Sequence, residues 1–279
     1  MTTPGTGAAV VTGAASGIGR ALAGAWGAEG MTVELSDLNQ PGLQEAAEEL
    51  SAKGVECVAE VVDVSDPAAV ERLADVAFAR FGRVSVVCNN AGVSTMGKQW
   101  EIGQDDWDWV IGVCLGGVVN GVRSFVPRLL AQGGPAHIVN TASMGGLLTS
   151  PFLGPYAAAK HAVVGLSKGL RAELAGTEVG VSVVCPGLVR TPILEGMRAH
   201  MARTGTDQGE EATFMFDALE RGLQTGMPAE VAAQLVVRAV QDDQFWILPN
   251  GAVHVPSVQA DFDEMLAAAA VAGPGRSAP

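Results

Sequence analysis

The feature of this sequence that most limits its fold is a regular alternation of short apolar runs with longer helical segments. Strands are expected at residues 8–11, 32–36, 56–62, 84–88, 137–141, 180–185 and 245–248. Strands that alternate with helices predict a parallel, doubly wound sheet. We therefore expect the α/β class: a single-domain Rossmann fold whose seven-stranded parallel sheet has helices on both faces.

The length of the chain, 279 residues, allows one domain or two. Folds of the α/β class often extend to about 250 residues as a single unit. Because no internal repeat and no interior linker is present, we predict one domain over residues 8–270. Residues 1–7 and 271–279 are expected to be a flexible and a disordered tail.

Charge and cysteine content exclude several classes of function. The formal net charge of −13 argues against nucleic acid and against anionic membrane surfaces as partners. The first residues have neither the basic start nor the apolar core of a signal peptide. No apolar run approaches the roughly 20 residues that a membrane span needs. The cysteines show no metal-ligand spacing, so we expect reduced thiols, no metal site and a cytoplasmic location.

Small and polar residues follow the expected strands. They are Gly13, Asp37, Asp63, Asn90, Ser143 and Pro186. Ligands of doubly wound sheets bind at the carboxyl ends of the strands. The coincidence of these residues with those ends is the strongest indication of a ligand site in the sequence.

The first strand continues into a Gly-rich turn, Thr12-Gly-Ala-Ala-Ser-Gly-Ile-Gly19, and a helix is expected to begin near Ser16. Glycines at such a turn let the backbone approach a pyrophosphate, and the helix N-terminus offers free N–H groups. The turn alone is weak support for a nucleotide site. Asp37, about 20 positions later, strengthens it, because an acidic residue there holds the ribose 2′-hydroxyl of a dinucleotide.

Asp37 also indicates which dinucleotide is bound. A carboxylate accepts a hydrogen bond from a 2′-hydroxyl but repels a 2′-phosphate. The neighbouring residues Ala15, Leu38 and Asn39 are neutral, so no basic side chain offsets that repulsion. NAD is therefore expected rather than NADP. The alternative is that Asp37 is only a turn residue before Pro41.

Tyr156 and Lys160 lie four positions apart on an expected helix, so their side chains project from one face. A phenol has an unperturbed pKa of about 10, and a neighbouring cation favours the phenolate, so Tyr156 can exchange a proton with an alcohol or ketone. Ser143 follows the strand 137–141, where its hydroxyl can bind the same substrate oxygen. A helix that merely happens to carry a Tyr and a Lys is the alternative.

Taken together, the motifs resemble those of the short-chain dehydrogenase/reductase family, most strongly over residues 8–192. They are Thr12-Gly-x-x-x-Gly-Ile-Gly19, Asp63-Val64, Asn89-Asn-Ala-Gly92, Ser143, Tyr156-x-x-x-Lys160 and Pro186-Gly-x-Val-x-Thr191. The resemblance implies that Tyr156 is the general acid and base, that Ser143 orients the substrate oxygen, and that Lys160 lowers the pKa of the tyrosine and holds the nicotinamide ribose.

The resemblance also implies a set of cofactor contacts. Asp63 and Val64 would border the adenine, Asn90 to Gly92 the ribose, and Val189 and Thr191 the nicotinamide amide. The complete expected set is Gly13, Ser16, Gly17, Ile18, Gly19, Asp37, Asp63, Val64, Asn90, Ala91, Gly92, Tyr156, Lys160, Pro186, Gly187, Val189 and Thr191.

One position departs from the family pattern. The family usually carries an Asn on the long central helix, expected here at residues 105–130, and its role there is to bend the helix so that a backbone carbonyl holds a water joining the Lys to solvent. This chain has Cys114 instead. A thiol lacks the amide's hydrogen-bonding groups, so we expect a slower or differently wired proton relay. We interpret Cys114 as a structural thiol rather than a nucleophile, and His161 as a solvated or packed side chain.

In this family the substrate is held by loops after the fourth to sixth strands, here including residues 192–228. That stretch contains Ile193, Leu194, Met197, Met201, Phe214, Met215, Phe216 and Met227. Adaptable Met and Phe side chains suit a bulky apolar ligand. No cluster of Arg or Lys is apparent for a phosphate or carboxylate, although Arg190 and Arg198 flank the region. A hydrophobic secondary alcohol or ketone, aromatic ones included, is expected.

Two other functions remain open at this point. One is an NADP-dependent 3-ketoacyl-type reductase, and the other is a nucleotide-binding regulatory relative with impaired catalysis. We also expect a homodimer or homotetramer, because residues 105–130 and 156–174 carry apolar side chains on more than one face. These include Val118, Val119, Val122, Val163, Val164 and Leu166.

Overall fold

The computed structural model describes residues 7–205 and 209–271. The two predicted tails, 1–7 and 271–279, therefore lie outside the described residues, except for Gly7 and Val271. Gly7 occupies a bend before the first strand, and Val271 ends the last helix.

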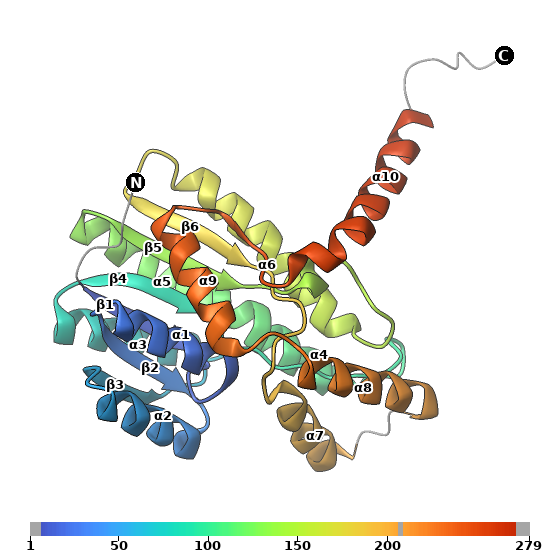
Figure 1. The fold of residues 1–279 in the computed structure, drawn as a ribbon, viewed down its shortest axis with the longest axis horizontal. Helices are drawn as coiled ribbons and strands as arrows, with labels where there is room; N and C mark the ends of the chain where they lie inside the picture. The colour runs from blue at the N-terminus through green and yellow to red at the C-terminus, as the bar shows by residue number, and fades with distance from the viewer. Residues whose placement is uncertain (1–6, 206–208, 272–279) are drawn as a thin grey trace.

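The fold is built on one seven-stranded sheet in which every strand pairs in parallel with its neighbours (Figure 1). The strand order is β3-β2-β1-β4-β5-β6-β7. The strands are β1 Ala8–Thr12, β2 Thr32–Asp37, β3 Cys57–Val61, β4 Val84–Asn89, β5 Ala136–Thr141, β6 Val179–Val184 and β7 Trp246–Ile247. The predicted fold class is confirmed, and each predicted strand is found within about two residues of its expected ends.

Helices cover both faces of the sheet. They are α1 Gly17–Ala28, α2 Gln40–Ala52, α3 Pro67–Phe81, α4 Gln104–Ile111, α5 Gly117–Gln132, α6 Gly154–Glu173, α7 Ile193–Thr204, α8 Gly209–Gln224, α9 Ala229–Gln241 and α10 Val255–Val271. One core cluster joins buried side chains of α3, α5 and α6 to the sheet, and a second joins those of α1, α2 and α9 to its other face. The three-layer arrangement follows, because a parallel sheet must be covered on both faces.

Local sequence signals account for where several helices begin. Asp66 caps α3 by accepting a hydrogen bond from the Ala68 N–H, and Pro67 occupies the first turn. Asn39 caps α2 in the same way by accepting from the Gly42 N–H. These caps place α2 and α3 directly after the strand ends at which the site is expected.

The long central helix differs from the expectation of a regular helix over residues 105–130. A π-helical turn, Gly112–Gly116, separates α4 from α5, and Cys114 lies in it. The whole stretch, Gln104–Gln132, has the length and composition of a membrane span, which was not expected from the sequence. Half of its most apolar part is buried in the fold. Core helices of soluble proteins meet the same criteria.

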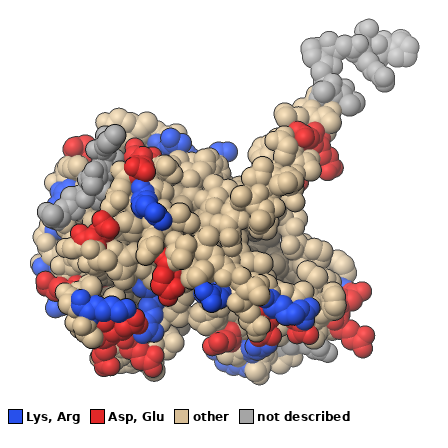
Figure 2. Space-filling view, in the orientation of Figure 1, with Lys and Arg blue, Asp and Glu red and all other residues tan. Residues whose placement is uncertain are grey.

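Two parts of the structure lie outside the three layers. Helices α7 and α8 form a small apolar cluster of their own, together with Met96. Helix α10 projects from the body as an arm (Figure 1), and its described surface is mostly uncharged (Figure 2). Phe262, Met265 and Leu266 on this arm are all at least half exposed.

Candidate active site

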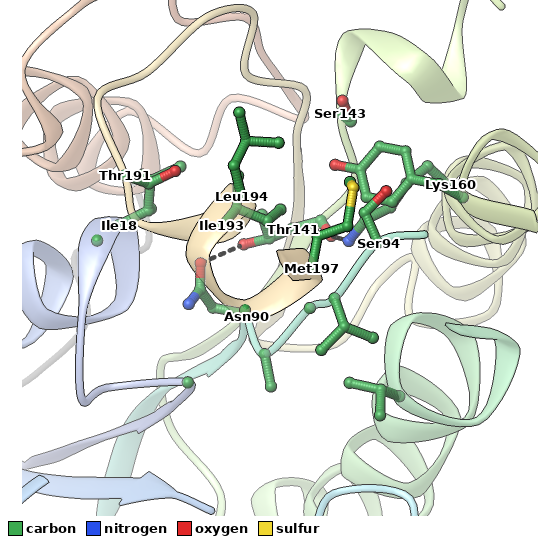
Figure 3. Close-up of a pocket in the computed structure, with 18 of the residues that line it drawn as sticks. Ile18, Asn90, Ser94, Thr141, Ser143, Lys160, Thr191, Ile193, Leu194 and Met197 are labelled. Carbon is green, nitrogen blue, oxygen red and sulfur yellow. Dashed lines mark hydrogen bonds between the residues drawn. The ribbon is translucent and has the colours of Figure 1, made fainter. Parts of the chain in front are cut away.

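One cavity of about 610 Å³ lies at the carboxyl ends of the strands. All of the site residues predicted from the sequence line it, from Gly13 after β1 to Thr191 after β6. Figure 3 shows residues of several strand ends and of α7 around this space. The structure thus brings together residues that are separated by up to about 180 positions in the chain.

The Gly-rich turn closes tightly onto the sheet. Gly13 has φ +67°, and a Cβ atom there would lie 2.8 Å from the Ala91 Cα. A Cβ on Gly19 would lie 2.1 Å from the Gly13 carbonyl oxygen. Larger residues cannot occupy these two positions without moving the backbone, which explains why the turn requires glycine.

The N-terminus of α1 faces the cavity with unused donors. Ser16 is the N-cap but makes no side-chain capping bond, and the first turn contains no acidic residue. Within the described residues, no acceptor is hydrogen-bonded to the N–H groups of Gly17, Ile18 or Gly19. Free N–H groups at the positive end of a helix dipole form an anion-binding site.

The Asp37 carboxylate lies at the end of β2 and is fixed by two backbone groups. Its Oδ2 accepts from the Ala15 N–H at 3.0 Å, and its Oδ1 accepts from the Asn39 N–H at 2.9 Å. Each oxygen keeps a further lone pair, and Asp37 lines the cavity. Among the described residues that line the cavity, only Lys160 and Arg203 are Lys or Arg, and Arg20, the closest in sequence to the turn, is paired with Glu49.

Asp63 and Val64 follow β3 at the same edge of the cavity. The Asp63 Oδ1 accepts from the backbone and the hydroxyl of Ser65. The Val64 carbonyl accepts from the Asn120 amide at 2.9 Å, which ties this loop to α5. Asn120, on the central helix, therefore supports the loop.

Asn90 connects three strand ends. Its side-chain amide donates to the Thr12 carbonyl at 3.0 Å, and its Oδ1 accepts from the Thr141 hydroxyl at 3.2 Å, the contact drawn in Figure 3. The backbone N–H groups of Asn90 and Ala91 both donate to the Thr12 hydroxyl. This network holds Asn90, Ala91 and Gly92 at the cavity floor.

The loop after β6 completes the cofactor side. Val189 forms an isolated parallel bridge with Met227, and the Arg190 N–H donates to the Met227 carbonyl. A Cβ on Gly17 would lie 3.0 Å from the Thr191 Cγ2, so this loop packs against the Gly-rich turn. Pro186 and Gly187 line the cavity at the start of the same loop.

Ser143 and Tyr156 meet beside Gly145. A Cβ on Gly145 would lie 3.4 Å from the Tyr156 Cε1 and 3.5 Å from the Ser143 Oγ. The Ser143 Oγ accepts from the Gly145 N–H at 3.0 Å, so its own O–H remains available to donate. Ser143 lies two residues beyond β5 and caps a short 3₁₀ turn, Met144–Gly146, rather than ending the strand.

Lys160 is almost completely buried, yet it lines the cavity. Its Nζ donates to the Thr141 carbonyl at 2.8 Å and lies 5.7 Å from the centre of the Tyr156 ring. An ammonium group has three donors, so others remain for a ligand or water. His161, one residue later, is exposed and bonds to the Ala157 carbonyl, as expected for a solvated side chain.

The Cys114 thiol contacts the backbone of the loop after β4. It accepts from the Val93 N–H at 3.3 Å and donates to the Val93 carbonyl at 3.1 Å. Sulfur is both a weak donor and a weak acceptor, so the thiol can make this pair of contacts without the amide that the family usually carries. All four cysteines are free, and Cys57 is only half-buried because it lies on β3 near the edge of the sheet.

Apolar side chains of α7 and α8 form the remaining wall. Ile193, Leu194 and Met197 line the cavity, as predicted for a substrate region. Met201, Met215 and Phe216 instead pack in the separate cluster of α7 and α8. Phe214 is 68% exposed, and Met227 packs beneath the loop after β6, so neither contributes to the wall.

Four interacting residues were missed in the sequence, and three of them, Trp109, His200 and Arg203, line the cavity. Trp109 of α4 stacks on His200 of α7, with ring centres 3.7 Å apart and planes 3° apart. The His200 Nε2 lies 2.5 Å from the Asp106 Oδ1, and its Nδ1 lies 3.0 Å from the Arg203 guanidinium. No local pattern marks these residues, because Asp106 and His200 are 94 positions apart.

Comparisons with known proteins agree with this geometry. A family model described as short chain dehydrogenase matches residues 7–202. The chain is 43% identical over 244 residues to 1-deoxy-11-beta-hydroxypentalenate dehydrogenase of Streptomyces avermitilis, covering 87% of this chain and 84% of the relative. It is 36% identical to C alpha-dehydrogenase of a Sphingobium species, covering 86% and 79%. A crystal structure of a short-chain dehydrogenase/reductase from Burkholderia phymatum in complex with NAD has a TM-score of 0.91 at 37% identity, covering 100% and 99%.

Proposed function

The chain belongs to the short-chain dehydrogenase family and is an oxidoreductase, and we propose that it interconverts a hydrophobic secondary alcohol and its ketone with NAD. The observation that carries this proposal is the meeting of Ser143, Tyr156 and Lys160 in a cavity that also contains the free N–H groups of α1. Relatives named as dehydrogenases support the same reaction class.

The residues present fit a dinucleotide. Gly17, Ile18 and Gly19 would bind its pyrophosphate through their N–H groups. The free lone pairs of Asp37 would accept from the adenine ribose, and the lack of a described Lys or Arg beside it favours NAD over NADP. When bound, the nicotinamide supplies the hydride acceptor or donor of the reaction.

The proton is handled by this chain's own residues. Ser143 donates its free O–H to the substrate oxygen and so orients it. Tyr156 takes the hydroxyl proton during oxidation and returns it during reduction. Lys160, held by the Thr141 carbonyl, provides the positive charge beside the phenol and directs its remaining donors to the nicotinamide ribose. Asp63, Val64, Asn90 to Gly92, Pro186, Gly187, Val189 and Thr191 would form the other cofactor contacts.

We further propose a cytoplasmic homodimer or homotetramer. Three of the apolar side chains expected at an interface, Val118, Val163 and Val164, are buried within the subunit. The apolar surface that α5 and α6 offer to a second subunit is therefore smaller than the sequence suggested. The exposed apolar side chains of α10 add to the surface that favours self-association. Light scattering at micromolar concentration should give a mass of two or four chains, and a strictly monomeric mass would contradict this proposal.

The function is tested with the purified protein in two steps. NADH binding is measured first by the change in its fluorescence. A panel of hydrophobic secondary alcohols is then offered with NAD or NADP, and the absorbance of the reduced cofactor is followed. NAD-dependent oxidation of at least one alcohol is expected. Failure to bind NADH, or binding without turnover of any alcohol or ketone in the panel, would count against the proposal.

A further inference from the structure

We propose that Arg203 binds an acidic group, such as a carboxylate, on the substrate, and that His200 and Asp106 are positioning residues that hold the guanidinium on the cavity wall. The proposal rests on the proposed function and deepens it, since it narrows the substrate to a hydrophobic alcohol or ketone that carries an anion. The cluster Trp109–Asp106–His200–Arg203 has no role in the proton transfer described above.

The two contacts of His200 indicate which ring nitrogen donates and which accepts. A guanidinium has only donors, so the His200 Nδ1, 3.0 Å from the Arg203 nitrogen, must be the acceptor. The proton of the ring is therefore on Nε2, which donates to the Asp106 Oδ1. The imidazole thereby joins a carboxylate on α4 to a guanidinium on α7.

Burial gives this chain of contacts its rigidity. Asp106 and His200 are 4% and 6% exposed, respectively, and the stacked Trp109 ring fixes the plane of the imidazole. Burying a carboxylate and an imidazole costs free energy unless both are hydrogen-bonded. The guanidinium at the end of the chain is exposed at the cavity surface. A preorganised arginine of this kind loses little entropy when it binds a ligand.

Arg203 is available to a ligand in a way that its neighbour is not. Arg198 lies on the same helix, pairs with Glu220 at 2.8 Å and does not line the cavity. Within the described ranges 7–205 and 209–271, Arg203 forms no ion pair with a carboxylate. Its donors beyond the one given to His200 are therefore free for a planar anion, which arginine binds in a bidentate manner.

The surroundings select the rest of the ligand. Ile193, Leu194 and Met197 on the same helix offer only apolar surface. Among the described cavity residues the other Lys or Arg is Lys160, which donates to the Thr141 carbonyl and whose remaining donors the proposed function assigns to the nicotinamide ribose. A net charge of −13 repels anions in general. A specific guanidinium on this wall therefore favours an acidic group borne on a hydrophobic skeleton.

The experiment compares matched ketones bound to the NADH-loaded protein. Each pair consists of an acetylarene with a carboxylate and the same skeleton with a methyl group, such as 4-acetylbenzoate and 4-methylacetophenone, with the acid zero to two methylenes from the ring. Dissociation constants are measured by calorimetry at pH 7.5. We expect at least tenfold tighter binding of one acid than of its neutral partner.

Variants of Arg203 and His200 test whether the preference for the acidic ketone comes from this cluster. Arg203→Gln should remove the tenfold preference without changing the affinity of the neutral ketone. Arg198→Gln is the matched control, with the same charge change on the same helix, and should leave both affinities unchanged. His200→Gln can still donate to Asp106 and accept from Arg203, so it should keep most of the preference, whereas His200→Leu should behave like Arg203→Gln.

The outcomes separate this proposal from the proposed function. Equal affinity within every pair, no binding of any ketone, or an equal loss for both members in Arg203→Gln would overturn the assignment of Arg203. The corresponding alcohols are then offered with NAD. Oxidation of a neutral alcohol without any preference for the acid leaves the function standing and refutes the anion site. Absence of NADH binding refutes the function itself.

Discussion

The two halves of the cavity are built by different means. On the cofactor side, the binding groups are mostly backbone atoms and glycines, and Gly13, Gly19 and Asp37 fall within one β1–α1–β2 unit. On the substrate side, the wall depends on side chains that meet across long sequence distances, as Asp106 and His200 do. The first half follows from a local motif, and the second depends on tertiary packing.

The two halves also differ in how they are joined to the core. Helix α1 packs in the large cluster that covers one face of the sheet. Helices α7 and α8 form a separate small cluster. Segments with few contacts to the main core open and rearrange at lower free energy. Substitutions on the substrate wall should therefore alter specificity with little effect on the sheet, whereas changes at the Gly-rich turn should affect folding and cofactor binding together.

The largest expected effect is at Tyr156, where the two halves meet. Tyr156→Phe removes the hydroxyl but keeps the ring and its packing, so turnover should fall by about 10²–10⁴-fold or more while NADH binding persists. Steady-state rates and NADH fluorescence titration measure the two quantities. A variant with near-normal turnover would show that the proton is handled elsewhere.

Lys160→Ala provides the comparison for that variant. Lys160 serves the tyrosine on one side and the cofactor on the other, so its loss should reduce both turnover and NADH affinity. If only turnover fell, the proposed contact with the nicotinamide ribose would be wrong.

The next effect tests the cofactor half alone. NAD should be preferred over NADP by at least about tenfold, or about 1.4 kcal/mol. Asp37→Ala should narrow the gap, because the repulsion of the 2′-phosphate and the acceptor for the 2′-hydroxyl are both lost. The ratio of kcat/KM values for the two cofactors measures it. Equal use of both cofactors by the unaltered protein would contradict the assignment of NAD as the preferred cofactor.

The fold and the cofactor half could be predicted from the sequence because their signals are local. Alternating strands and helices define the sheet, and the Gly-rich turn followed by Asp37 lies within about 25 residues. Tyr156 and Lys160 are one turn apart on a helix, so their proximity required no knowledge of tertiary structure.

The substrate wall could be predicted only in part: the apolar residues Ile193, Leu194 and Met197 were expected there, but the polar cluster beside them was not. No sequence pattern marks His200 and Arg203. Their proposed role depends on contacts with Asp106 and Trp109, which α4 brings next to them in the fold. The sequence drew attention to Arg198, which instead pairs with Glu220. The π-helical turn at Cys114 was also missed, because helical periodicity does not reveal a single extra residue in a turn.

A different effect, on stability rather than activity, distinguishes two carboxylates of β2, Asp37 and Glu34. Asp37 is hydrogen-bonded at both oxygens, whereas neither Glu34 oxygen has a partner among the described residues. Burial, followed by the nearby Glu60 charge, raises the pKa of Glu34 from 4.5 to about 8. The folded state therefore holds this proton more tightly than the unfolded state does. The proton's contribution to the free energy of unfolding is complete below about pH 4.5 and is lost as pH rises through about 8.

Glu34→Gln should remove the loss of stability that Glu34 causes at high pH. Melting temperatures of the two proteins should agree near pH 5, and the variant should melt several degrees higher at pH 9, since one pKa unit corresponds to about 1.4 kcal/mol. Glu45→Gln, at an exposed position on α2, is the control for removing a charge and should show no such pH-dependent gain. A Glu34→Gln protein that melts lower at pH 9 would contradict the buried, unpaired state of this carboxylate.

The smallest expected effect concerns Cys114, which lies where α4, the loop after β4 and α6 come together. The thiol already bonds to both backbone groups of Val93, and the π-helical turn is present without the family's Asn. An amide makes stronger hydrogen bonds than a thiol does, so Cys114→Asn should leave turnover equal or raise it by no more than a few-fold. The rate of alcohol oxidation and the NADH affinity measure the change. A tenfold loss of turnover in a variant with unchanged melting temperature would mean that this chain uses the thiol itself to shape the proton path behind Lys160.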